Sequence, residues 1–431
     1  MAALYTVSVF ILLLFCGLTL DYGMLELTRD KMQNAADAAA VAEELYFERS
    51  SSPTGSDPGI AVASQYGFTD GSNNTTVTYV ANNLINADQG GVYNGQYDGL
   101  QIQIARTIPT MFMALANIPS VNVMVRSVAA VPACQYYLGT KSLATPTVSV
   151  SSGGNVGQVF TKCSAYIGGG ATINSGDWWQ AWQTYLTGSS GGTTANGRWK
   201  SGATYGTPTR ADPLSSDITA PTVGSCNHSN LSYGNLSGGA MSQTLSPGVY
   251  CGSVSGSTVT PGLTLLNGTV TLNPGLYIIT GGINWQRVTV TGTGVTLYFT
   301  NVSGHSTKFG GVLITDLSTL TLSAATGATF GSAVAGSGGA LAGVLFYLDR
   351  NWVNTAAQDF NFNSSAGTIN GVWYLPDTGL LFLNGSDNCS TMCGVVADNL
   401  NLTNWQISWS SENFAGIVGG NPFRQQGPLV Q

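Results

Sequence analysis

The chain has 431 residues, of which 56 are glycine and only 8% are charged, against roughly 25% in an average globular protein. Aromatic residues make up 10% of it, which argues against a disordered chain, because disordered chains are charge-rich and poor in aromatics. The net charge of −7 and the lack of a basic cluster exclude nucleic acid as a partner. Abundant Gly and β-branched residues disfavour helices over most of the length, so we expect a mainly β protein.

Residues 1–20 carry no charged side chain and form a strongly apolar run. About 20 helical residues span the roughly 30 Å hydrocarbon core of a bilayer. A cleaved signal peptide would show a basic start and an A-x-A-like site, and neither is present. We therefore expect a retained membrane helix that contacts the lipid bilayer through residues 1–20.

A helical pattern without proline continues from residue 21 to residue 49 and ends at the turn-forming residues 50–55. Small and apolar residues recur every three or four positions, which predicts one packed face. These residues are Met24, Leu27, Met32, Ala35, Ala39, Ala42 and Leu45. We predict one continuous helix over residues 1–49 and place the first domain at residues 1–50.

This helix contains two motifs whose combination is specific. The first is Asp21-Tyr22-Gly23, and the second begins at Gln33 and reads Gln33, Asn34, Ala35, Ala36, Asp37. Together they resemble the N-terminal signature of the TadE/TadG-like proteins of the tight-adherence (Flp) pilus-assembly family. Residues 100–130 resemble the family's following segment, with TIPTMF at residues 107–112.

The resemblance implies an exported protein of a bacterial cell envelope, anchored in the inner membrane with a periplasmic or extracellular domain. Other pilus or envelope proteins are the implied partners. Many TadG-like proteins also carry a D-x-S-x-S metal site. The nearest string here, at residues 316–320, lacks the last hydroxyl, so no metal site is implied.

Residues 51–132 are predicted to form a small α+β stalk domain. A short helix is expected at residues 58–66 and strands at 75–80, 100–108 and 121–131, with a helical turn at 110–116.

Residues 133–431 show short β-branched runs separated by Gly, Asn and Ser turns. The string L-x-P-G-[VL]-Y occurs twice, ending at Tyr250 and at Tyr277. Repeats of this kind predict a parallel β-helix-like extracytoplasmic domain, with Tyr250 and Tyr277 at equivalent positions of neighbouring coils. A β-sandwich or jelly roll is the rival architecture.

Residues 177–186, DWWQAWQTYL, are the one helix candidate in this domain. Such a helix would cap an open end of the coils. The alternative use of this segment is contact with carbohydrate through Trp178, Trp179 and Trp182.

Six of the seven cysteines lie outside the apolar run and form an even set. Pairing in chain order would give Cys134–Cys163, Cys226–Cys251 and Cys389–Cys393, although six cysteines allow other connectivities. Disulfides indicate an oxidising compartment. A zinc site is the rival, but the spacing lacks a C-x-x-C knuckle and His228 and His305 are the only histidines.

No catalytic or cofactor-binding motif is apparent, so we predict neither an enzyme nor a cofactor. Parallel β-helices are often polysaccharide lyases or hydrolases, and the C-terminal coils contain five candidate acids for such chemistry: Asp316, Asp349, Asp359, Asp377 and Asp398. Two of them could form an acid–base pair across adjacent coils, or they could cap turns.

Three functions therefore compete. The first is a membrane-anchored structural and adhesive component of a tight-adherence pilus system. The second is a tethered carbohydrate-active β-helix enzyme, and the third is a pilin-like subunit that self-associates into filaments through its N-terminal helix.

Overall fold

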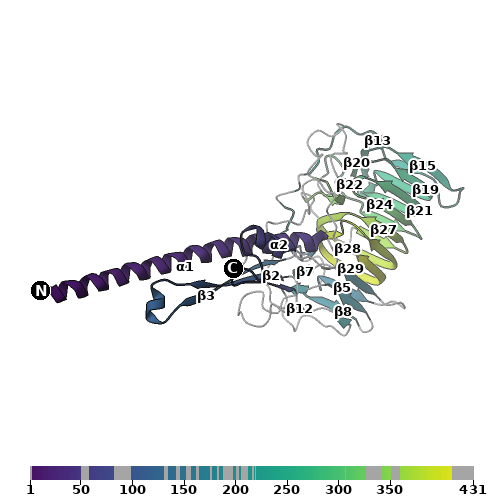
Figure 1. Ribbon diagram of the computed structural model, residues 1–431. Coiled ribbons are helices and arrows are strands. Elements are labelled where there is room, and N and C mark those ends of the chain that lie inside the picture. Colours follow the sequence, from purple (N-terminus) through teal and green to yellow (C-terminus); the bar gives the residue numbers. More distant parts are fainter. Residues whose placement is uncertain are drawn as a thin grey trace. The chain divides into compact units, whose positions relative to one another are not determined.

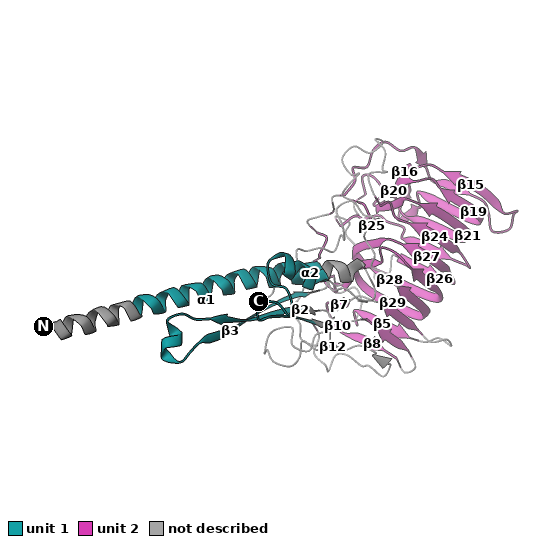
Figure 2. Ribbon diagram, in the orientation of Figure 1, with its two compact units in different colours: residues 1–131, 426–431 teal, residues 132–425 magenta. Residues whose placement is uncertain are grey.

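The computed structural model describes residues 2–49, 58–81, 99–130 and 134–409. Within the last range it leaves out residues 142–145, 152–156, 162–164, 175–176, 182–183, 188–197, 200–202, 205–211, 216–217, 219, 306, 327–340 and 351–359. The chain divides into two compact units, residues 1–131 with 426–431, and residues 132–425 (Figure 1, Figure 2). Each unit is described by itself.

Unit 1 is one long helix with a small antiparallel sheet and a short second helix. Helix α1 runs without a break over Ala2–Arg49, which confirms the predicted single helix. The remaining elements agree closely with the predicted ones: α2 (Pro58–Gln65), β1 (Thr75–Ala81), β2 (Gly99–Pro109), the 3₁₀ turn η2 (Met113–Ala116) and β3 (Ser120–Ala130). The strand order is β1-β2-β3, and β2 and β3 form a long hairpin with Pro109 opposite Ser120.

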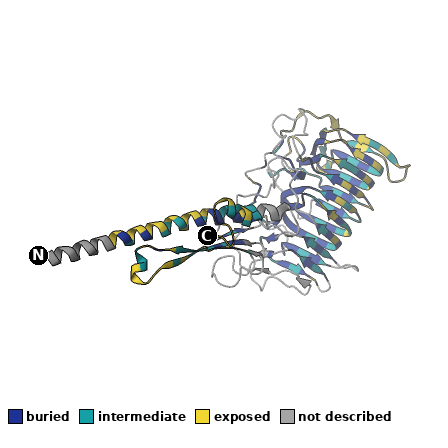
Figure 3. Cartoon of the chain, in the orientation of Figure 1, coloured by how far each residue is buried: buried dark blue, intermediate teal, exposed yellow. Residues whose placement is uncertain are grey.

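One face of α1 is buried, and alanines make up most of its middle part. Ala35, Ala36, Ala39 and Ala40 are fully buried in a core that also contains Ile102 of β2 (Figure 3). Small residues let the helix lie close to the sheet. The predicted face was wrong at its N-terminal end, because Met24 and Leu27 are 43% and 57% exposed.

In the part of the chain that the structure describes, no helix combines the length and apolar character that a membrane crossing needs. The side chains of residues 1–14, which make up most of the predicted span, lie outside the described set.

Unit 2 is a stack of coils built almost wholly from parallel strands. One sheet of 24 strands contains all of them except the antiparallel hairpin of β17 (Ser253–Ser255) and β18 (Thr258–Thr260). The N-terminal strands are β4 (Gln135–Tyr137), β5 (Val148–Ser151), β6 (Gln158–Thr161), β7 (Ala165–Ile167), β8 (Ala171–Ile173), β9 (Trp178–Gln180), β10 (Thr184–Leu186), β11 (Arg198–Trp199) and β12 (Ala203–Thr204).

The C-terminal strands supply most of the coils. They are β13 (His228–Ser229), β14 (Leu231–Tyr233), β15 (Met241–Leu245), β16 (Gly248–Cys251), β19 (Leu263–Leu272), β20 (Gly275–Thr280), β21 (Ile283–Thr293), β22 (Val295–Thr300), β23 (Val312–Thr315), β24 (Thr319–Ser323), β25 (Val344–Leu348), β26 (Phe360–Asn363), β27 (Ala366–Asn370), β28 (Val372–Cys389) and β29 (Gly394–Trp409). The predicted parallel strands are therefore present.

Each coil contributes three stretches of strand, which stack into three columns that we call A, B and C. In the coil of β22, β23 and β24, these strands belong to columns A, B and C, and each pairs in parallel with β25, β26 and β27 of the next coil. The long strands β28 and β29 pass through all three columns. Columns B and C alternate buried and partly exposed residues, whereas β20 and β22 of column A are buried throughout.

The order of the coils in space differs from their order in the chain. The last coil, β29, pairs in parallel with β28 and also with β4, β5 and β6, the first coil of the unit. The N-terminal coils continue from there through β7–β12, and the C-terminal coils start at the far end with β13. The chain therefore begins the solenoid at a central coil, β4–β6, and adds coils toward one end up to β12. It then crosses to the opposite end at β13 and returns coil by coil to the centre at β29.

The crossing segment is held on the outside of column A. Leu214 and Ile218 belong to the main hydrophobic core. Arg350 donates hydrogen bonds to the backbone carbonyls of Leu214, Ser215 and Ile218, and its guanidinium lies 5.3 Å from the Tyr374 ring centroid. The described part of this segment therefore covers column A beside Tyr374.

The corner between columns B and C uses left-handed residues in successive coils. Asn267, Arg287, Asp316, Ser364, Asn384 and Asn404 all have φ between 50° and 58°. Asparagine tolerates this conformation better than most residues, and the Asn404 amide donates to Asn384 Oδ1 at 2.8 Å. The corner therefore forms a ladder along the stack.

Tyr250 and Tyr277 lie on parallel strands of neighbouring coils, as predicted, and their rings stack with centroids 5.9 Å apart. Both hydroxyls donate to the carbonyl four residues earlier, Ser246 and Asn273. The predicted equivalence was wrong by two residues, because the partner of Tyr277 is Gly248. The register shifts at the corner, because Leu245 still pairs with Leu272. Between this pair and the pair of Gly248 with Tyr277, the first coil has two residues and the second has four.

The helix predicted at residues 177–186 is wrong. The described residues there form β9 and β10, each of which extends a column of parallel strands. Tertiary pairing outweighs the helical spacing of the aromatic residues, because each strand completes the edge of the coil before it.

Two of the three predicted disulfides, Cys226–Cys251 and Cys389–Cys393, are present. Cys134 is also disulfide-bonded, while Cys163 lies outside the described residues. Cys16 is exposed and unpaired with another cysteine.

The two disulfides should differ in their contribution to stability. Their sequence separations are 25 and 4. On the chain-entropy model, replacing Cys226 and Cys251 by Ser should lower the free energy of unfolding by about 3.5 kcal/mol, and replacing Cys389 and Cys393 by about 2 kcal/mol. Denaturant unfolding of both double variants measures the difference. Equal losses would contradict the entropic explanation.

Candidate functional site

The first motif of the N-terminal helix is used to hold the hairpin of unit 1. The carboxylate of Asp21 accepts hydrogen bonds from the backbone N–H groups of Met111, Phe112 and Met113, at 3.0, 2.7 and 2.7 Å. These amides begin the 3₁₀ turn η2, whose first N–H groups have no partner within the turn. Asp21 is 1% exposed. Burial acts to raise its pKa, but the three N–H donors together lower it below the usual value.

A glycine one turn before Asp21 completes this contact. A Cβ atom built at Gly17 would lie 2.2 Å from Cδ1 of the Phe112 ring. The ring is therefore seated against the helix backbone, where only glycine leaves room. Gly17 and Asp21 thus fix the tip of the β2–β3 hairpin on α1. We call this contact the Asp21 latch.

The second motif makes another contact on the same side of the helix. The Gln33 amide donates to Asp37 Oδ1 at 2.8 Å and to the carbonyl of Arg126 in β3 at 2.9 Å. Ala35 and Ala36 are buried, and Asn34 is exposed. Further along, buried Glu43 accepts from the Gly59 N–H at 2.8 Å. The motif residues therefore join the helix to its own domain.

Tyr22 and Gly23 have a different environment. Tyr22 is 64% exposed, and a Cβ at Gly23 would meet no atom within 4 Å. Neither is explained by packing within unit 1.

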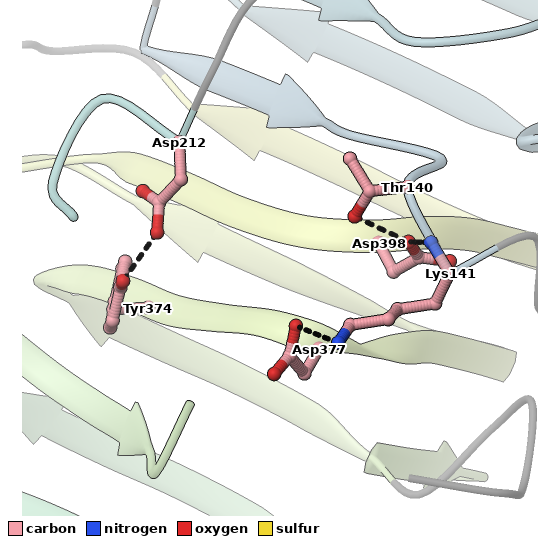
Figure 4. Close-up of polar contacts among 6 residues, drawn as sticks. All are labelled: Thr140, Lys141, Asp212, Tyr374, Asp377 and Asp398. Carbon is pink, nitrogen blue, oxygen red and sulfur yellow. Dashed lines mark hydrogen bonds and ion pairs between the residues drawn. The ribbon is translucent and has the colours of Figure 1, made fainter. Parts of the chain in front are cut away.

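In unit 2, three carboxylates from separate segments face a common region beside column A (Figure 4). Asp377 of β28 forms an ion pair with Lys141 at 3.3 Å. Asp398 of β29 is fully buried and accepts from the backbone N–H of Lys141 at 2.8 Å. Asp212 of the crossing segment accepts from the Tyr374 hydroxyl. Burial raises the pKa of Asp377, Lys141 opposes this, and Asp398 and Asp212 add to it.

These contacts tie together segments that are distant in the chain. Lys141 lies in the first coil, between β4 and β5. Asp398 and Asp377 belong to the last two coils, and Asp212 lies in the crossing segment. Each carboxylate contacts a group from another segment of unit 2. The arrangement therefore fastens the middle of the solenoid.

The other predicted site residues do not gather into one site. Trp179 is fully buried and donates to Thr184 Oγ1 at 3.0 Å, so its ring is unavailable to carbohydrate. Trp178 is half-buried, and Trp182 lies outside the described residues, as does Asp359. Asp316 occupies the left-handed corner, and Asp349 accepts from Thr300 at 2.9 Å.

A buried charged residue that the sequence pattern did not predict is Asp387, which lies inside column C. Burial raises the pKa of Asp387 to about 7, while the Trp409 indole N–H donates to its Oδ2 at 3.2 Å and opposes the rise. The string L-x-[FL]-L-N-G marks the corner that precedes Asp387, at residues 380–385 in LLFLNG, and it also occurs as LTLLNG from Leu263.

Comparison with known proteins identifies the N-terminal segment. Residues 1–42 match the family model described as putative Flp pilus-assembly TadE/G-like. The start of this chain is similar to that family. This confirms the resemblance drawn from Asp21-Tyr22-Gly23 and the Gln33 motif, and it indicates a role in Flp pilus assembly and a location in the cell envelope. No curated protein and no solved structure matches the chain.

The Asp21 latch should be visible in amide exchange. Asp21→Asn keeps one acceptor oxygen but removes the charge, so hydrogen exchange at Met111, Phe112 and Met113 should become faster. Exchange in the middle of β2 should be unchanged. Asp30→Asn, at an exposed position of the same helix, is the matched control. Unchanged protection in Asp21→Asn would show that the latch contributes little.

Asp387 should make the stability of unit 2 depend on pH. The unfolded chain releases this proton near pH 4, whereas the folded state keeps it until about pH 7. Between these values the folded state binds more protons, so the free energy of unfolding falls as pH rises and is level above pH 7. Three pH units correspond to a loss on the order of 4 kcal/mol.

Asp387→Asn should remove this dependence and should be more stable than the wild type at pH 8. Denaturant unfolding at pH 4.5 and pH 8 measures both effects. Asp316→Asn, at an exposed corner, should leave the slope in place. An unchanged slope in Asp387→Asn would assign the dependence to other groups.

Proposed function

We propose that this chain is a membrane-anchored, exported structural and adhesive component of a tight-adherence (Flp) pilus system, and that it performs no catalysis. The observation that carries the proposal is the TadE/G-like match over residues 1–42. The anchor is the apolar run of residues 1–20, placed in the bacterial inner membrane, with unit 2 in the periplasm or outside the cell. Other pilus or envelope proteins are the partners.

The chemistry of unit 2 supports export. Disulfides persist in oxidising compartments and are rare in the cytosol. Cys226–Cys251 and Cys389–Cys393 both lie in this unit. A parallel solenoid with a low charge content also suits a long-lived extracellular part.

The surface that best fits an adhesive role is the outer side of column C. Thr269, Thr289 and Thr319 are aligned on successive strands. A second row, two residues further along each strand, is formed by Thr271, Thr291, Thr321 and Thr368. Neighbouring strands lie about 4.8 Å apart, so the rows form a regular array of hydroxyl groups. We call this array the threonine face.

Catalysis has less support. Among the described residues, Asp377, Asp398 and Asp212 lie near one another, and each interacts with Lys141 or Tyr374. A glycosidase needs one carboxyl group as acid and another as base or nucleophile beside a substrate. The filament alternative depends on the N-terminal helix, and the deletion experiment that follows also tests it.

An in-frame deletion in the source bacterium tests the proposal. Loss of surface attachment, with loss or misassembly of Flp pili in electron micrographs, is expected, and the intact gene should restore both. The gene with Thr319→Lys and Thr321→Lys should restore pili but not attachment. Gln286→Lys, on column B, is the control. Normal pili and attachment in the deletion strain would refute the proposal, and labelling along the filament would favour the subunit alternative.

A further inference from the structure

The tip of the β2–β3 hairpin, residues 110–119, is unusually apolar for an exposed turn. Met111 and Leu115 are 70% and 74% exposed, and Ile118 is 43% exposed. The sequence has no charged residue between Arg106 and Arg126. A solvated hairpin end is normally polar, so this composition requires an explanation.

Backbone N–H groups of the tip donate hydrogen bonds either to carbonyls of the same turn or to Asp21 of α1. The N–H groups of Thr110, Leu115, Asn117 and Ile118 donate to carbonyls of the same turn, and the Thr110 hydroxyl donates to the Ile118 carbonyl. The N–H groups of residues 111–113 donate to Asp21. A segment that leaves water must satisfy its backbone groups in this way.

The Asp21 latch fixes the height of the tip along the helix. Phe112 lies against Gly17, and the amides of residues 111–113 lie against Asp21. If residues 1–20 occupy the bilayer, Gly17 lies about 5 Å inside its boundary at 1.5 Å per residue. The tip is then held at the boundary between hydrocarbon and headgroups.

At the same level of the helix, exposed side chains are of the apolar and aromatic kinds that occur where a bilayer meets water. Leu20 is 62% exposed and Tyr22 is 64% exposed, and tyrosine is enriched at membrane–water interfaces.

We propose that the tip of the β2–β3 hairpin is a second membrane contact, which lies in the interfacial layer of the bilayer that takes up residues 1–20. This inference rests on the proposed membrane anchor. Residues 1–20 and the hairpin tip then both contact the bilayer, and the Asp21 latch keeps them in a fixed arrangement. Two such contacts fix the tilt and rotation of unit 1 relative to the bilayer as well as its depth.

Fluorescence quenching in vesicles tests the proposal. The full chain carries Cys16→Ser, and an environment-sensitive nitrobenzoxadiazole label is attached at one new position: Leu115→Cys in the tip, Ser8→Cys in the apolar run or Ala61→Cys on α2. Ala61 is exposed and lies beside the end of α1 near Glu43, about 33 Å from Asp21 along the helix. Vesicles of phosphatidylethanolamine and phosphatidylglycerol are prepared with and without a doxyl-labelled lipid.

The labels at residues 8 and 115 should be quenched more than twofold by the doxyl lipid, and the label at residue 61 should not. Quenching at residue 8 but not at residue 115 would overturn the inference and leave the anchor in place. A blue-shifted but unquenched label at residue 115 would also overturn it, because the tip would then contact protein. Absence of quenching at residue 8 would refute the anchor itself.

Discussion

The pairing of coil β29 on both of its edges is the interaction on which unit 2 depends. Its strands bond to β28 on one side and to β4, β5 and β6 on the other. A parallel coil with only one neighbour exposes a full row of N–H and C=O groups. With β29 in place, the two blocks of coils share one continuous ladder and one core. Without it, each block would have an open edge.

Several buried carboxylates of the described residues join segments of the chain in a similar way. Asp21 accepts from the amides of η2, Glu43 from Gly59, Asp177 from Gly157 and Asp398 from Lys141. In each case a carboxylate satisfies a backbone donor of another segment. Bonds of this kind to a charged group are stronger than neutral ones. A low charge content is therefore compatible with firm attachment between segments.

The sequence predicted the local elements and the family well, because these depend on residues that are close in the chain. The continuous helix, the hairpin strands and the adjacent cysteine pairs follow from periodicity and spacing. The chain path of the solenoid could not be predicted, because nothing in the composition of β4 distinguishes a terminal coil from a central one. The helix predicted around Trp179 failed for the same reason, since its strand conformation is imposed by the neighbouring coils. Asp21 could be predicted only as part of a family motif. Its hydrogen-bond partners could not be predicted, because they lie some 90 residues away in the sequence.

The return of the chain to its first coil has a consequence for synthesis. The coils of residues 134–204 leave the ribosome first, yet the edge of β4, β5 and β6 that receives β29 stays open until residue 409 has been made. Contacts between residues so far apart form late and slowly. During that interval the nascent chain presents an unpaired parallel edge, which is a template for association with other chains. The arrival time of β29, more than the speed at which any single coil forms, then determines how long the newly made protein depends on protection by chaperones.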